Sequence, residues 1–137
     1  MRILVIDAQG GGIGRQLIAA IKQELPACKI TAVGTNGTAT AAMLKAGADE
    51  AATGENSVVV CSRSADLIVG PVGIVIADSL LGEITPKMAA AVAQSKAVRV
   101  LIPFSHCDNL IAGVSELNTK GLINDAVEKI KALCTPQ

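Results

Sequence analysis

The hydrophobic and polar positions of this chain alternate between short apolar runs and helical stripes from one end to the other. Residues 3–6 are apolar and mostly β-branched, which is typical of a buried strand. After Gly14 the apolar residues fall at helical spacing, which predicts a helix; they are Leu17, Ile18, Ile21 and Leu25. The chain therefore begins with a strand, a tight turn and a helix.

The same two periodicities recur along the rest of the chain. Further strands are predicted at residues 29–33, 50–53, 66–70 and 98–102. Helices are predicted at residues 38–46, at 57–65 with Asn56 as the cap, at 85–95 with Thr85 and Pro86 at the start, and from Asn118 or Thr119 to about Cys134. The helix at residues 57–65 is apolar on more than one side, which predicts deep burial.

Two segments have a less regular pattern. Residues 74–81 suit either a short buried helix, which we favour, or a strand, and residues 110–114 suit an edge strand. Because strand and helix alternate elsewhere, we predict a single three-layer α/β domain over residues 1–137, Rossmann-like, with a mostly parallel sheet of about five strands. Hydrophobic residues form 50% of the chain and Phe104 is the one aromatic, so aliphatic side chains must build the core.

The turn after the first strand contains four glycines, Gly10, Gly11, Gly12 and Gly14. Such a turn lets the backbone approach an anion and directs free N–H groups and the positive end of the helix dipole toward it. We therefore expect a phosphate to contact the N–H groups of Gly12, Ile13 and Gly14. Asp7 would stand at the rim, where it could accept a hydrogen bond from a ribose or hold the loop through backbone N–H groups. We favour the second role because a carboxylate repels phosphate. The alternative is that these glycines only form a tight turn and allow close packing.

The residues Ala8-Gln9-Gly10-Gly11-Gly12-Ile13-Gly14 resemble the TGxxxGIG turn of the short-chain dehydrogenases. Asp7 and Ala8 stand where that family has Thr and the first Gly. Members of that family also need a Y-x-x-x-K pair for proton transfer, and this chain contains no tyrosine. We therefore expect no dehydrogenase activity of that kind.

A second wall of the site is predicted from the fourth strand. In a doubly wound sheet the loops after the first and fourth strands meet at the switch point, so Gly70, Pro71 and Gly73 would face the ligand. A turn shaped only for packing is an equal alternative. At the end of the second strand, where dinucleotide-binding folds carry an acidic residue for the ribose, this chain has Thr35 and Asn36. The choice among NAD, NADP and another adenine nucleotide therefore stays open.

His, Cys and Ser gather in one loop, at Ser105, His106 and Cys107. A thiolate beside an imidazole can act as a nucleophile, and the loop follows a predicted strand. However, His106 and Cys107 are sequence neighbours, and no third residue is evident to orient the histidine. A polar loop without catalysis is the favoured interpretation.

Charge and hydropathy exclude several other classes of protein. The net charge is zero and no Lys/Arg block occurs, so no nucleic-acid partner is expected. The most apolar stretch, residues 67–77, is too short to cross a bilayer, and no signal peptide is evident, so we expect a cytoplasmic protein. The four cysteines lack C-x-x-C spacing and are expected to be free, mostly buried thiols without a metal; they are Cys28, Cys61, Cys107 and Cys134.

Three motifs together, V-I-D-A-Q-G-G-G-I-G, G-P-V-G-I-V-I-A and L-G-E-I-T-P, resemble a family of small bacterial proteins of unknown function. The resemblance implies a Rossmann-like fold and nucleotide binding. We expect a domain that binds a small phosphate-bearing ligand for sensing or regulation. An enzyme of unknown reaction and a structural or interaction subunit are the alternatives. The apolar segment at residues 72–84 further suggests a homodimer.

Overall fold

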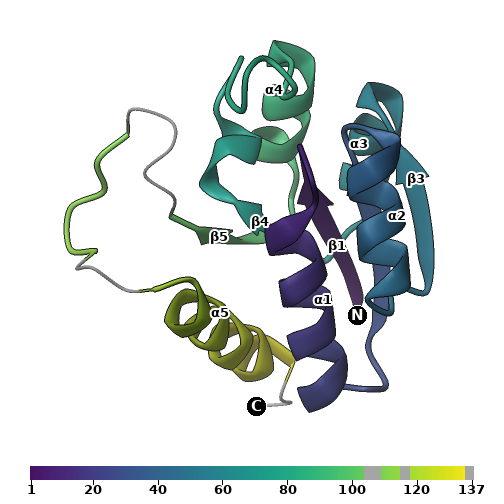
Figure 1. Ribbon diagram of the computed structural model, residues 1–137, viewed down its shortest axis with the longest axis vertical. Helices are drawn as coiled ribbons and strands as arrows, with labels where there is room; N and C mark the ends of the chain where they lie inside the picture. The colour runs from purple at the N-terminus through teal and green to yellow at the C-terminus, as the bar shows by residue number, and fades with distance from the viewer. Residues whose placement is uncertain (104–108, 115–117, 135–137) are drawn as a thin grey trace.

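Five parallel strands form one sheet at the centre of the computed structural model, which describes residues 1–103, 109–114 and 118–134 (Figure 1). The strands are β1 (Arg2–Asp7), β2 (Lys29–Gly34), β3 (Glu50–Thr53), β4 (Leu67–Pro71) and β5 (Val98–Ile102). Their order across the sheet is β3-β2-β1-β4-β5, and every neighbouring pair is parallel. All five predicted strands are thereby confirmed.

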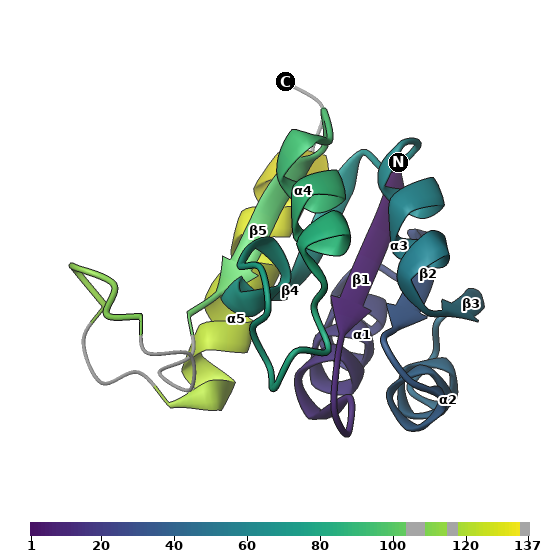
Figure 2. The same ribbon diagram turned by 90° about the horizontal axis from the view of Figure 1, so that it is seen from above.

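Helices cover both faces of this sheet (Figure 2). They are α1 (Gly12–Glu24), α2 (Gly37–Lys45), α3 (Glu55–Ser62), the 3₁₀ helix η1 (Val72–Val75), α4 (Pro86–Gln94) and α5 (Thr119–Cys134). Alternate residues of β1 point to opposite faces, so Val5 packs with α1 and α5 while Ile6 packs with α3 and α4. The predicted three-layer α/β architecture is therefore confirmed.

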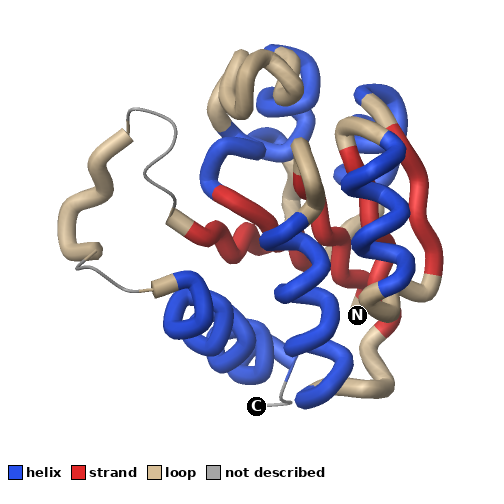
Figure 3. The backbone as a smooth tube through the Cα atoms, in the orientation of Figure 1, coloured by secondary structure: helices blue, strands red, loops and turns tan. Residues whose placement is uncertain are grey.

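The strand order reverses direction at β1. Strand β2 lies on one side of β1 and continues to β3, whereas β4 lies on the other side and continues to β5. The carboxyl ends of β1 and β4 consequently adjoin, which is the switch point where open α/β sheets bind ligands. Figure 3 shows that the loop after β1 and the 3₁₀ helix η1, which directly follows β4, lie at the same edge of the sheet.

Two predicted helix caps are present. The Thr85 hydroxyl accepts a hydrogen bond from the Met88 N–H at 3.2 Å, and Pro86 occupies the first helical position of α4. The Asn118 side chain accepts from the Gly121 N–H at 2.8 Å at the start of α5. The third cap was predicted wrongly: α3 begins at Glu55, with Gly54 as its N-cap, and Asn56 lies inside the first turn.

Three further predictions were wrong: the deep burial of α3, the helix at residues 74–81 and the edge strand at residues 110–114. Helix α3 buries one stripe against the sheet, so Val58 is inaccessible while Val60 is 46% exposed. Residues 74–81 form no α-helix; η1 is followed by turns in which Asp78, Leu80 and Leu81 have positive φ. Residues 110–114 form no strand, because Gly113 adopts a left-handed conformation and breaks the extended run.

Candidate functional site

A pocket of 280 Å³ lies at the carboxyl ends of β1 and β4. Six of the residues predicted from the sequence line it, namely Asp7, Gly10, Gly12, Ile13, Pro71 and Gly73. Leu80, from the segment after η1, and Thr119, at the start of α5, complete the wall. The loops after the first and fourth strands therefore form two walls of one pocket.

Three of the predicted glycines are required by packing and do not line the pocket. A side chain on Gly70 would strike the carbonyl oxygen of Ile6 in the neighbouring strand, and one on Gly14 would strike the Met43 thioether. Gly11 has φ 70°, and a Cβ there would lie 2.9 Å from the Ala39 Cα. These glycines let strand and helices approach closely.

Packing does not require glycine at positions 10 and 12. A Cβ on either residue would meet nothing within 4 Å, and neither backbone lies in the left-handed region. Gly12 is the first residue of α1, and both glycines line the pocket. Because neither residue has a side chain, the pocket next to both glycines stays open.

Asp7 holds the glycine turn from the end of β1. Its carboxylate accepts hydrogen bonds from the Ala8 N–H and the Gly14 N–H, each at 2.7 Å, and the residue is 5% exposed. Burial raises the pKa of Asp7 above its ordinary value, the N–H groups of Gly14, Ala8 and Ile13 oppose this shift, and the charge of Glu83 adds to it.

Two of the three N–H groups expected to contact a phosphate have a partner within the chain. The Gly14 N–H is already bonded to Asp7, and the Ile13 N–H also interacts with that carboxylate. Within the residues the structure describes, no hydrogen bond engages the N–H groups of Gly10 and Gly12. An anion in this pocket would therefore contact the turn at Gly10 and Gly12.

Thr35 and Asn36 are not part of the pocket wall. Their side chains donate hydrogen bonds of 2.6 Å and 2.7 Å to Oε1 of Glu83, and the Gln9 N–H donates to the same oxygen at 3.0 Å. Burial acts to raise the pKa of Glu83, but the hydrogen bonds from Thr35, Gln9 and Asn36 together outweigh it and hold the pKa below its ordinary value. A carboxylate thus lies at the end of β2 after all.

Glu83 was missed because it is 47 residues from Asn36 along the chain. No local pattern links a residue before α4 to the tip of β2. The motif L-G-E-I-T-P contains it, and that was the available signal.

Comparison with known proteins places the chain in a family. A model of DUF3842, a domain of unknown function, matches residues 2–135. The chain belongs to this family. No curated protein matches this DUF3842 domain. Among solved structures it is similar to a dodecameric FMN-dependent UbiX-like decarboxylase from Escherichia coli O157:H7, with 16% identity, a TM-score of 0.49, and coverage of 97% of this chain and 76% of that chain.

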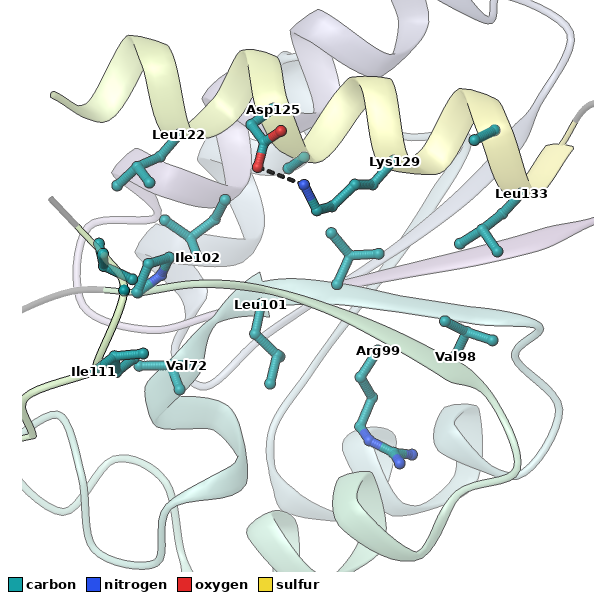
Figure 4. Close-up of a pocket in the computed structure, with 16 residues that line it drawn as sticks. Val72, Val98, Arg99, Leu101, Ile102, Ile111, Leu122, Asp125, Lys129 and Leu133 are labelled. Carbon is teal, nitrogen blue, oxygen red and sulfur yellow. Dashed lines mark hydrogen bonds and ion pairs between the residues drawn. The ribbon is translucent and has the colours of Figure 1, made fainter. Parts of the chain in front are cut away.

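A larger pocket, of 790 Å³, lies elsewhere in the DUF3842 domain, between β5, α5 and residues 109–114 (Figure 4). Its lining is mainly apolar and includes Ile111 and Leu133, while Asp125 and Lys129 form an ion pair of 2.7 Å along α5. Among the described residues, none of those predicted to form the site lines it. The charged side chains of its described lining are engaged within the chain, Asp125 with Lys129 and Arg99 with backbone carbonyls, so we take the smaller pocket as the candidate site.

The sequence also singled out a possible catalytic loop and four cysteines. Ser105, His106 and Cys107 lie outside the described residues. In the described part, Cys28, Cys61 and Cys134 are free thiols, half-buried rather than buried as expected. The same part contains no group of three His, Cys, Asp or Glu side chains placed to hold a metal ion, and none of its helices has the length and hydropathy to span a membrane.

Proposed function

We propose that this DUF3842 domain binds a phosphate-bearing nucleotide in the 280 Å³ pocket and acts as a sensing or regulatory domain. The observation that carries this proposal is the pair Gly10 and Gly12. Packing explains Gly11, Gly14 and Gly70, but it leaves these two without a structural role. Glycines that serve only to keep a pocket open are expected where a ligand approaches the backbone.

The phosphate would bind against the N–H groups of Gly10 and Gly12. Gly12 begins a helix of 13 residues, whose dipole attracts an anion at this end. Asp7 repels an anion, so the phosphate would lie on the side of the turn away from that carboxylate. The N–H groups bonded to Asp7 then keep the loop in shape for the ligand.

The size of the pocket favours a mononucleotide. Its 280 Å³ lies just below the range of about 300–1,000 Å³ that is usual for small-molecule sites. An adenine mononucleotide is the first candidate, and NAD(P) would extend beyond the pocket. FMN, another mononucleotide, belongs in the same test.

The described lining of the pocket supports a proposal of binding without catalysis. Asp7 is the single ionisable side chain that lines the pocket within the described residues, and its carboxylate is bonded to two backbone N–H groups. General acid–base or nucleophilic catalysis needs a group free to exchange a proton or attack the substrate. The part of the lining that the structure describes supplies none.

Calorimetric titration with AMP, ATP, NAD, NADP and FMN tests this proposal, together with native mass spectrometry of freshly purified protein. Gly12→Val should abolish binding and leave the fold intact, because its side chain would fill open space in the pocket. Gly37→Val is a matched control: Gly37 is the first residue of α2, also has open space around it, and lies outside the pocket. Equal loss of binding in both variants, or no binding by the unaltered protein at millimolar concentration, would refute the proposal.

We also propose a homodimer through residues 72–84. The sequence suggests this dimer because the segment is apolar and a small domain would leave it exposed. In the structure, however, Ile74 and Ile84 are buried within the chain itself. Leu81 is the residue that supports the proposal now, since it is 95% exposed. Light scattering at micromolar concentration measures the mass directly, and a monomer would contradict the proposal.

A further inference from the structure

Glu83 reaches the end of β2 through an unusual chain path. The segment after η1 folds back on itself: the Ser79 hydroxyl donates to the Gly73 carbonyl, and the Asp78 N–H donates to the Ile84 carbonyl at 2.8 Å. Figure 2 shows the connection between η1 and α4 descending beside the end of β1 before it rises into α4. This path carries the Glu83 carboxylate to the tips of β1 and β2.

The two oxygens of this carboxylate have different surroundings. Oε1 accepts three hydrogen bonds, from the Gln9 N–H, the Thr35 hydroxyl and the Asn36 amide. Oε2 accepts none from the described part of the chain. Asn36 is itself fixed, because its Oδ1 caps α2 by accepting from the Ala39 N–H at 2.9 Å. The side chain is therefore held in one orientation with one free acceptor.

We propose that Oε2 of Glu83 accepts a hydrogen bond from a ribose hydroxyl of the bound nucleotide, so that the site selects a ribose without a 2′-phosphate. This inference rests on the proposed nucleotide site. Glu83 is not itself a lining residue, but its carboxylate accepts a hydrogen bond from the N–H of Gln9, which lines the pocket. The carboxylate is therefore one residue away from the pocket wall. In sheets of this order the ribose of a nucleotide bound at the first turn extends toward the end of the second strand.

The charges around the site support the selection of an unphosphorylated ribose. A carboxylate accepts hydrogen bonds from the two hydroxyls of a ribose but repels a 2′-phosphate. No arginine or lysine lines the pocket within the described residues, so nothing there would neutralise a second phosphate. Thr35 and Asn36 contribute by holding Glu83 rather than by direct contact with the ligand.

Titrations with three nucleotides test this inference. AMP carries the intact ribose, 2′-deoxy-AMP lacks the 2′-hydroxyl, and adenosine 2′,5′-bisphosphate carries the extra phosphate. The unaltered protein should bind AMP roughly tenfold or more tightly than either of the other two, as expected for a hydrogen bond to a charged group. Equal affinity for AMP and 2′-deoxy-AMP would overturn the inference while the proposed function stands. Binding of FMN alone from the panel would also overturn it, because FMN has an open ribityl chain.

Glu83→Gln separates recognition from a purely structural role. The glutamine keeps an oxygen for Gln9, Thr35 and Asn36 and places an NH₂ donor where Oε2 stood. This variant should lose most of the discrimination between AMP and 2′-deoxy-AMP and should bind the 2′,5′-bisphosphate more tightly than the unaltered protein does. Glu55→Gln is the matched control, since Glu55 also accepts a hydroxyl hydrogen bond, from Thr85 at 2.6 Å, and lies outside the pocket.

The outcomes distinguish this inference from the function on which it rests. If the unaltered protein binds none of the nucleotides, the proposed function fails. If AMP binds and Glu83→Gln keeps the full discrimination, Glu83 only holds the loop and the inference is wrong. Thermal unfolding of both variants shows that each is folded before it is titrated.

Discussion

The carboxylate of Asp7 accepts a hydrogen bond from the backbone N–H of Gly14 at 2.7 Å and so binds the first turn of α1 to the end of β1. A negative side chain thus occupies part of the space at the helix N-terminus that a ligand's phosphate occupies in other folds of this class. The turn is preformed by the protein itself. Asp7 does not engage the N–H groups of Gly10 and Gly12, and these are the groups that the proposed ligand would contact.

Asp7→Ala should lower the free energy of unfolding by about 1–3 kcal/mol, because it leaves the N–H groups of Ala8 and Gly14 without an acceptor in a buried position. Urea denaturation monitored by circular dichroism measures the change. Asp125→Ala, on the exposed face of α5, is the control and should change stability by less than about 0.5 kcal/mol. A loss for Asp7→Ala no larger than that of the control would show that the carboxylate does not hold the turn.

Asp7 and Glu83 should give the stability opposite dependences on pH. The folded pKa of Asp7 is raised, so its contribution is present in full below its ordinary pKa of 3.8 and is lost as pH rises through the folded value. The folded pKa of Glu83 is lowered, so its contribution is present above its ordinary pKa of 4.5 and is lost as pH falls through the folded value.

Two variants isolate these contributions. The stability of the unaltered protein relative to Asp7→Asn should decrease as pH rises above 3.8, and its stability relative to Glu83→Gln should decrease as pH falls below 4.5. Urea midpoints measured at intervals between pH 3 and pH 8 give both differences. If stability plotted against pH gives parallel curves for a variant and the unaltered protein, the group that the variant replaces has the same pKa in the folded and unfolded chains.

The glycines of the first turn should separate into two classes on substitution. Gly11→Ala forces a Cβ into the left-handed region and against the Ala39 backbone, so it should cost about 1–3 kcal/mol. Gly10→Ala and Gly12→Ala meet open space and should stay within about 0.5 kcal/mol of the unaltered protein or stabilise it slightly. Chemical denaturation of the three variants decides this. Equal destabilisation by all three would remove the argument for a ligand.

The sequence predicted those parts of the fold that depend on local periodicity. The strand of residues 3–6 and the stripe through Leu17 and Ile21 each carry their own signal, and the structure confirms both. The sequence also brought Asp7, Gly10 and Gly12 to one turn, because they are close together along the chain. Glu83 was not predictable in this way, because its position depends on a chain reversal in which Leu80 and Leu81 have positive φ, and no local pattern predicts that conformation for leucine.

Leu81 provides a last prediction, because its backbone and its side chain are both unfavourable in an isolated chain. Its φ is 59°, a conformation that costs a leucine about 1–2 kcal/mol, and its side chain is 95% exposed, so little packing offsets that cost. Leu81→Asn should therefore stabilise a monomer by up to about 1 kcal/mol, since asparagine tolerates this conformation. Leu80→Asn is the control, because Leu80 also has positive φ but is partly buried against the hydrophobic core between the sheet, α3 and α4, and its replacement should destabilise the chain.

The concentration dependence of this effect tests the proposed dimer. If Leu81 contacts a second copy, its replacement removes apolar contact area from the dimer, and mass action makes the loss larger at higher protein concentration. Thermal unfolding at 1 µM and at 100 µM should then show Leu81→Asn more stable than the unaltered protein at the lower concentration and less stable at the higher one. A stabilisation of equal size at both concentrations would mean that Leu81 has no partner in solution, and the dimer through residues 72–84 would be refuted.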